Sequence, residues 1–222
     1  MSVSTNPRRT TISLLIVGIA LLALSMGLGA WIAIGRGNAP FVVDALWAEW
    51  LAGGRTPVLL SFSFVMNWLG AGWFGVLVAP LMIAGLLALR RRWWAAAFFL
   101  AAEAATAVIV QILKHLFGRA RPEEIIVLSD FGSFPSGHVA NAAAIAVALA
   151  VIFPRLWVIL VGVAWVLLMA FSRTYLGAHW LSDTLGGALA GAGAALVLAA
   201  VFARRIPLIP YDHRDTAPHG VR

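Results

Sequence analysis

The 222-residue sequence has no cysteine and little charge. Without a thiol, a disulfide framework, a thiolate metal site and a cysteine nucleophile are all impossible. Charged residues make up 11% of the chain and hydrophobic residues 62%, a composition far more apolar than that of a soluble domain. The chain is therefore expected to lie in a membrane.

Most apolar residues form runs that could cross about 30 Å of hydrocarbon as a helix. We predict an all-α, polytopic membrane protein with six transmembrane helices, at about 12–34, 70–89, 93–115, 138–153, 157–175 and 180–202. They form one membrane domain over 12–205, between an N-terminus over 1–11 and a tail over 206–222 that is expected to be flexible. The first run follows Arg8 and Arg9, as in a signal peptide, but its length favours a retained span.

The stretch 41–69, between the first two predicted spans, mixes tryptophan with sparse charge. This composition suits a helix that lies in the membrane interface. Its second half, 58–68, could instead dip into the membrane.

The basic residues indicate how the chain is oriented. With six spans both termini lie on one side, and that side holds ten of the sixteen basic residues, namely Arg8, Arg9, Arg90, Arg91, Arg92, Arg155, Arg204, Arg205, Arg214 and Arg222. Because basic residues favour the inside, we place both termini in the cytoplasm and the chain in the plasma (inner) membrane of a bacterium. The net charge of +7 does not indicate a nucleic-acid partner, because the basic residues stand at the ends of apolar runs.

Three polar segments interrupt the apolar pattern at span ends that this topology places on the outer side. The first, KHLFGRARP over 114–122, holds Lys114 and Arg121 seven residues apart, on one face of a continuing helix. Two cations near the end of a span are costly in lipid, and a bound phosphate would explain their presence. For the pair taken alone, interfacial snorkelling is the simpler explanation.

The second segment, FPSGH over 134–138, stands where the fourth predicted span begins. Gly137 permits close backbone contact, and a helix that starts near His138 offers unpaired N–H groups to an anion. Ser136 could equally be an ordinary N-cap.

The third segment, SRTYLGAHWLSD over 172–183, places His179 and Asp183 four residues apart on one helical face. A carboxylate bonded to one imidazole nitrogen leaves the other as a nucleophile or base. Arg173 adds a second guanidinium fork for phosphate. The alternative is a His and Asp pair that only holds two helices together.

Taken together, the three segments supply three cations, two histidines and a carboxylate, which is equipment for phosphoryl transfer. Lys114 is the only lysine of the chain. The patterns K-x6-RP, PSGH and SR-x5-H-x3-D resemble, at every motif position, the signature of the type 2 phosphatidic acid phosphatase superfamily, whose members are integral membrane lipid phosphatases.

The resemblance implies that His179 attacks phosphorus to form a phosphohistidine, that Asp183 orients it, and that His138 protonates the leaving oxygen and later helps to activate water. It also implies a set of phosphate-binding residues, Lys114, Arg121, Ser136, Gly137 and Arg173. No metal and no other cofactor is expected, because these cations would neutralise charge and the loops lack an acidic cluster.

The expected substrate is a membrane lipid phosphate or diphosphate of the polyprenyl diphosphate, phosphatidate or phosphatidylglycerophosphate type, presented at the extracytoplasmic face. One alternative is a lipid phosphotransferase with the same site. Another is a non-catalytic lipid-phosphate binding or transport protein, which would have no use for the His179 and Asp183 pair. Soluble vanadium haloperoxidases have a similar anion site, but six lipid-length spans argue against them. The sequence does not indicate an oligomeric state.

Four further carboxylates stand near these segments. Glu103 lies inside the third predicted span, where an acid is a candidate functional group, but we favour a structural role in which it is protonated or bonded to a neighbouring helix. Glu123, Glu124 and Asp130 lie in the outer loop and are expected to be solvated.

Overall fold

The computed structural model describes residues 7–70 and 72–206, and over these ranges the regular structure is entirely helical. The all-α prediction is therefore confirmed for this part of the chain. The predicted tail, apart from Ile206, and the first six residues of the predicted N-terminal segment lie outside the described residues.

The chain forms long helices joined by short turns and one longer loop. Their order is α1 (Pro7–Ala30) with a π-helical extension η1 (Trp31–Gly35), α2 (Val42–Gly53), α3 (Pro57–Gly70), a π-helical turn η2 (Phe74–Val78) leading into α4 (Ala79–Leu89), α5 (Trp93–Phe117), α6 (Gly137–Ile152), α7 (Leu156–Tyr175) and α8 (Leu181–Phe202).

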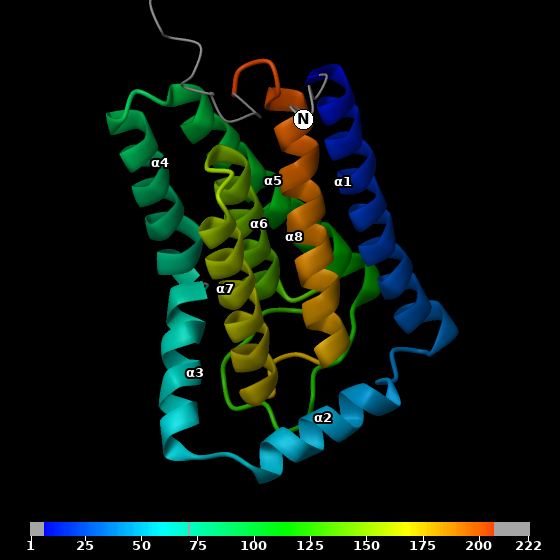
Figure 1. The fold of residues 1–222 in the computed structure, drawn as a ribbon. Coiled ribbons are helices and arrows are strands. Elements are labelled where there is room, and N and C mark those ends of the chain that lie inside the picture. The colour runs from blue at the N-terminus through cyan, green and yellow to red at the C-terminus, as the bar shows by residue number, and fades with distance from the viewer. Residues whose placement is uncertain (1–6, 71, 207–222) are drawn as a thin grey trace, which may run out of the picture.

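The long helices run side by side in a bundle, with α3 and α4 stacked end to end at one edge and α2 lying across one end (Figure 1). Helix α8 is central and packs against α1, α5 and α6. The start of α1, the α4–α5 and α6–α7 turns and the end of α8 lie at one end of the bundle. Helix α2, the loop over 118–136 and the α7–α8 turn lie at the other end.

Four helical segments are long and apolar enough to cross a membrane: Arg8–Gly35, Trp93–Phe117, Leu156–Tyr175 and Leu181–Phe202. They confirm four of the predicted spans. A fifth candidate is the pair Pro57–Gly70 and Phe74–Leu89, bent by 47° at the break between them. Helix α6 is apolar but has 16 residues, which at 1.5 Å per residue is about 24 Å, so the full count of six remains a prediction.

The stretch expected to be one interfacial helix consists of two helices with different roles. Helix α2 suits the interface, because it exposes Val42, Leu46 and Trp50 to more than half of their area while it buries Asp44. Helix α3 instead continues into η2 and α4 along the bundle (Figure 1). Its sequence contains no charged residue, so no ionic side chain opposes its insertion. If the bent pair is one span, it begins at Pro57 instead of at the predicted residue 70.

Helix α8 packs closely on α6 through two glycines four residues apart. A β-carbon on Gly191 would lie 2.0 Å from the Ala140 carbonyl oxygen, and one on Gly187 would lie 2.4 Å from the Ser136 carbonyl oxygen. Small residues at this spacing let two helix backbones approach within a membrane. This contact holds the start of α6 beside the start of α8.

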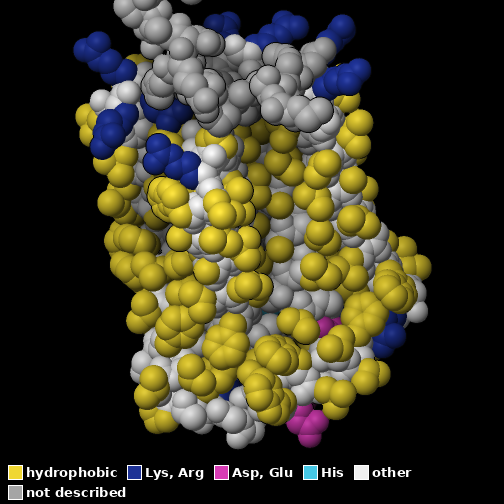
Figure 2. All heavy atoms as spheres, in the orientation of Figure 1, with side chains coloured by type: hydrophobic (Ala, Val, Ile, Leu, Met, Phe, Trp, Pro, Cys, Tyr) yellow, Lys and Arg dark blue, Asp and Glu magenta, His cyan; other side chains and the backbone are white. Residues whose placement is uncertain are grey.

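The surface of the bundle matches the expected charge pattern. Lys and Arg side chains gather at the end where α1 begins and α8 ends, and the flank that faces the viewer is covered mainly by hydrophobic side chains (Figure 2). A flank of this kind suits contact with lipid.

Candidate active site

The three polar segments meet at the end of the bundle beside α2. Helix α5 stops at Gly118, whose left-handed φ of 54° and N–H bond to the Lys114 carbonyl oxygen at 2.9 Å turn the chain away from the helix axis. After α7, Gly177 has a φ of 65°, and a β-carbon there would lie 2.6 Å from the Glu124 carbonyl oxygen. The α7–α8 turn therefore packs directly against the loop over 118–136.

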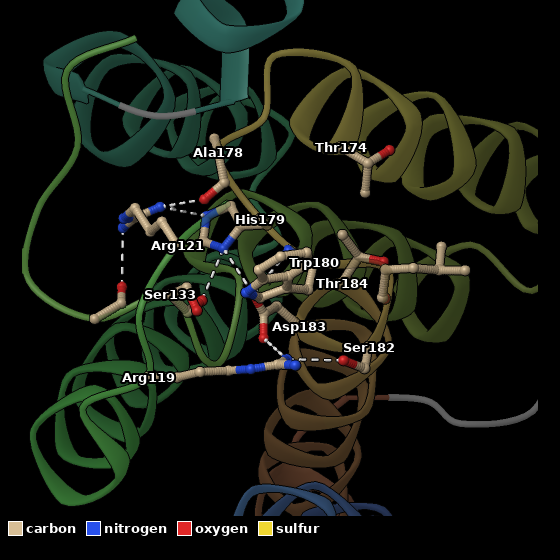
Figure 3. Close-up of polar contacts among 12 residues, drawn as sticks. Arg119, Arg121, Ser133, Thr174, Ala178, His179, Trp180, Ser182, Asp183 and Thr184 are labelled. Carbon is tan, nitrogen blue, oxygen red and sulfur yellow. Dashed lines mark hydrogen bonds and ion pairs between the residues drawn. The ribbon is translucent and has the colours of Figure 1, made fainter. Parts of the chain in front are cut away.

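His179 lies in this turn with a defined orientation. Its Nδ1 is 2.7 Å from the backbone carbonyl oxygen of Ser133 (Figure 3), and since a carbonyl oxygen only accepts, Nδ1 carries the proton. The other nitrogen, Nε2, then carries the lone pair and accepts a long hydrogen bond from Arg121 Nη1 at 3.4 Å. This is the tautomer that a nucleophilic imidazole needs.

The surroundings also favour the neutral form of this imidazole. Burial, followed by the positive charges of Arg173, Arg121 and Lys114, lowers the pKa of His179 well below its ordinary value. The ring is therefore neutral at physiological pH, with Nε2 available to attack.

Asp183 is less directly coupled to His179 than the resemblance implies. Its Oδ2 is 3.7 Å from His179 Nδ1, too long for a hydrogen bond. The same oxygen accepts the backbone N–H of Trp180 at 2.9 Å, which caps α8, and Oδ1 accepts Arg119 Nη1 at 2.6 Å. The hydrogen bond that orients His179 is instead the one that it donates to the Ser133 carbonyl oxygen. This bond was not predicted, because every residue has a backbone carbonyl and the sequence does not show which one accepts.

Arg119 connects Asp183 to helix α2. Its guanidinium donates to Asp44 at 2.9 Å as well as to Asp183, and all three side chains are fully buried (Figure 3 shows Arg119 and Asp183). Asp44 also accepts the backbone N–H of Ser182 at 2.8 Å and the Ser182 hydroxyl at 2.6 Å. Neither Arg119 nor Asp44 was predicted to take part in the site, although Arg119 stands inside the first motif.

Lys114 and Arg121, predicted to share one helical face, converge although the helix ends between them. Lys114 Nζ and Arg121 Nη2 reach the same carboxylate oxygen of Asp130, at 3.2 and 2.8 Å, and both donate to the Gly132 carbonyl oxygen. Asp130 was expected to be solvated; its side chain is indeed 55% exposed, but it also pairs with both cations, which was not expected. Partial burial raises its pKa, but the charges of Lys114 and Arg121 outweigh burial and hold the pKa of Asp130 below its ordinary value.

Arg173 and His138 are both held by Asn67 of α3. Arg173 Nη1 donates to the Asn67 side-chain oxygen, and His138 Nε2 lies 3.2 Å from the Asn67 carbonyl oxygen. An amide inside an apolar helix is a signal that could have identified Asn67 from the sequence.

Ser136 and Gly137 stand at the start of α6. The Ser136 side chain makes no capping bond, and its buried Oγ has no hydrogen-bond partner among the described residues. This observation argues against the simple N-cap and leaves a hydroxyl and a helix N-terminus free for an anion.

One cavity of about 600 Å³, which we call the site cavity, reaches this region. Its polar lining includes Lys114, Asp130, Gly137, His138, Arg173 and His179. Arg121 contacts His179 and Asp130, Ser136 precedes Gly137, and Asp183 lies buried behind His179. All eight residues singled out from the sequence are thus gathered at one end of the bundle.

The chain is similar to several known proteins. Lipid A 1-phosphatase from Rhizobium johnstonii is 34% identical over 110 residues, which are 45% of this chain and 44% of the relative, so the match spans less than half of that protein. A PAP2-type phosphatidylglycerolphosphate phosphatase from Bacillus subtilis has a crystal structure that aligns with a TM-score of 0.72 and 25% identity, over 83% of this chain and 94% of that one. LpxE from Aquifex aeolicus aligns with a TM-score of 0.62 and 26% identity, over 71% of this chain and 95% of that one.

The family model of the PAP2 superfamily matches residues 95–207. This range begins in α5 and contains all three polar segments. The chain belongs to the PAP2 superfamily.

Proposed function

We propose that the protein is a metal-independent lipid phosphate phosphatase that forms a phosphohistidine on His179. The observation that carries the proposal is the Nε2 lone pair of a neutral, buried His179 placed beside Arg121, at a cavity that Lys114 and Arg173 also line. The relatives are named as phosphatases of lipid A and of phosphatidylglycerolphosphate, which supports a lipid phosphate or diphosphate as substrate.

The first step forms one bond and breaks another. His179 Nε2 forms a bond to phosphorus while the bond from phosphorus to the leaving oxygen breaks. His138, which must carry a proton on both ring nitrogens for this step, gives one of them to that oxygen. In the second step His138 takes a proton from water, the water oxygen attacks phosphorus, and the N–P bond breaks to release inorganic phosphate. His179 keeps its Nδ1 proton on the Ser133 carbonyl oxygen throughout, and Asp183 stabilises the positive charge that develops on the ring.

The phosphate charge is neutralised by Lys114, Arg121 and Arg173, and the Ser136 hydroxyl and the N–H of Gly137 add hydrogen bonds. Among the residues that the structure describes, no group of three or more His, Asp or Glu side chains could hold a metal ion. The proposal therefore assigns charge neutralisation to these cations.

The site lies at the end of the bundle opposite to the basic end (Figures 1 and 2). With the basic end in the cytoplasm, the site faces the extracytoplasmic side, where a lipid presents its phosphate while its chains stay in the bilayer.

The test is release of inorganic phosphate by the purified protein, with chelator present, from a panel of phosphatidate, phosphatidylglycerophosphate, lipid A and polyprenyl diphosphate. We expect chelator-resistant release that falls by at least about three orders of magnitude in His179→Ala, because the nucleophile is lost. His115→Ala is the matched control, since His115 is exposed, its Nδ1 bonds the Gln111 carbonyl oxygen of its own helix, and its ring contacts Phe131, which is not a site residue. Equal release by His179→Ala and wild type would refute the proposal, and label that moves to a second lipid instead of water would indicate the phosphotransferase.

A further inference from the structure

The site cavity extends well beyond the phosphate-binding residues, into the membrane-spanning part of the bundle. Val76, Leu77 and Leu81 of η2 and α4 line one side, and each is more than half exposed. This wall therefore reaches the outer surface of the bundle, which suits contact with lipid chains. The cavity thus connects the catalytic residues with the hydrocarbon region.

Helix α5 presents a polar stripe to this cavity. Glu103, Gln111 and Lys114 all line it, and their spacings of eight and three residues place them on one helical face. At 1.5 Å per residue, Glu103 lies about 16 Å from Lys114 along the helix axis. If the phosphate of a lipid contacts Lys114, the middle of its hydrocarbon chain would therefore lie beside Glu103.

Glu103 was expected to be either a protonated carboxyl or bonded to a neighbouring helix, and the described residues show no such bond. Its Oε1 is buried and makes no hydrogen bond within residues 7–70 and 72–206. A carboxyl at this depth in a span costs several kcal/mol unless a polar partner satisfies it. Since it faces the site cavity, a ligand can supply that partner.

We infer that Glu103 forms a hydrogen bond with a hydroxyl or amide group in the hydrophobic part of the substrate, and that the substrate is a lipid phosphate carrying such a group rather than a plain polyprenyl chain. A hydroxyl or amide satisfies the carboxyl in either protonation state, because each can donate and accept. The inference rests on the proposed function, since it identifies the lipid held at the same site.

The experiment measures binding, so that it does not depend on turnover. Two lysophosphatidates are compared, one with a stearoyl chain and one with a hydroxystearoyl chain whose hydroxyl is in mid-chain. Their Kd values are measured on His179→Ala protein in nanodiscs. We expect about five-fold tighter binding of the hydroxylated lipid, the discrimination that one net hydrogen bond provides.

In protein that also carries Glu103→Leu the preference should vanish, whereas Glu103→Gln should retain part of it because an amide still bonds a hydroxyl. Thr106→Val is the matched control, since Thr106 lines the same cavity but its hydroxyl already donates to the Ala102 carbonyl oxygen at 2.8 Å. The inference is overturned if Glu103→Leu keeps the preference, if Thr106→Val abolishes it equally, or if the parent protein shows none. Phosphate release by wild type, measured separately on both lipids, reports on the proposed function alone.

Discussion

At the scale of single residues, Asp130 lies where a phosphate would be expected. Its carboxylate bridges Lys114 and Arg121, the two cations that the first motif contributes. The side chain is 55% exposed, so water weakens the attraction and an entering dianion can displace it. Under the proposed function, Asp130 is an internal anion that competes with the phosphate of the substrate.

Asp130→Asn removes this competitor while keeping the side-chain size. We expect KM for the lipid phosphate to fall about two- to five-fold with kcat little changed, because an exposed ion pair contributes only about 0.4–1 kcal/mol. Steady-state kinetics with the best substrate of the panel measure both constants.

Glu123→Gln provides the control, because Glu123 lies in the same exposed loop and no described hydrogen bond or ion pair joins it to either cation. If KM rises in Asp130→Asn, then Asp130 positions the two cations and does not compete with phosphate.

At the scale of elements, α2 is joined to the site by a charged contact in the protein interior. Asp44 is its only fully buried acidic residue, and through Arg119 and Ser182 it reaches the loop over 118–136 and the start of α8. Removing one partner of a buried ion pair leaves the other charge uncompensated. Helix α2 thereby contributes to the geometry behind His179.

Asp44→Ala should lower the free energy of unfolding by about 3 kcal/mol and reduce kcat, because Arg119 would no longer hold Asp183 in place. Thermal unfolding in detergent, followed by tryptophan fluorescence, measures the first effect, and phosphate release measures the second. Glu49→Gln, an exposed change on the same helix, should alter neither. An Asp44→Ala protein as stable and active as wild type would show that α2 is only a surface anchor.

At the scale of the whole molecule, the absence of cysteine permits a direct test of orientation. A single thiol introduced by Ser129→Cys lies in the exposed loop near the site, and one introduced by Arg90→Cys lies in the turn at the basic end. With the site extracytoplasmic, a membrane-impermeant maleimide added to intact cells should label only the first. Labelling of only Arg90→Cys would reverse the proposed orientation, and permeabilised cells control for reactivity.

The overall architecture was largely predictable because it depends on local properties. Helices α5, α7 and α8 begin and end within about two residues of the prediction, since each apolar run is bounded by a charge or a turn residue. Helix α3 ends at Gly70, where the second predicted span began, but its continuation into η2 and α4 as one bent pair was not predicted. The stretch 41–69, predicted as one interfacial helix with the alternative that 58–68 dips into the membrane, forms the two helices α2 and α3, and the membrane position of α3 stays a prediction.

The candidate site was predictable as a set of residues but only partly as a set of contacts. The spacing of His179 and Asp183 correctly placed them near each other, yet Asp183 is committed to Arg119 and to the cap of α8. The convergence of Lys114 and Arg121 was predicted for a continuous helix and instead arises after Gly118 ends α5. The catalytic roles of all eight site residues remain predictions.

The sequence by itself determined the all-helical membrane class, the family and the eight residues gathered at the site, because hydrophobic run length and motif spacing are properties of the chain alone. Only the tertiary structure decided that the Ser133 carbonyl orients His179, that Asp44 meets Arg119, and that Glu103 faces the site cavity. These contacts join different elements or depend on how the helices pack, and helix packing is set by close approaches such as Gly191 on Ala140.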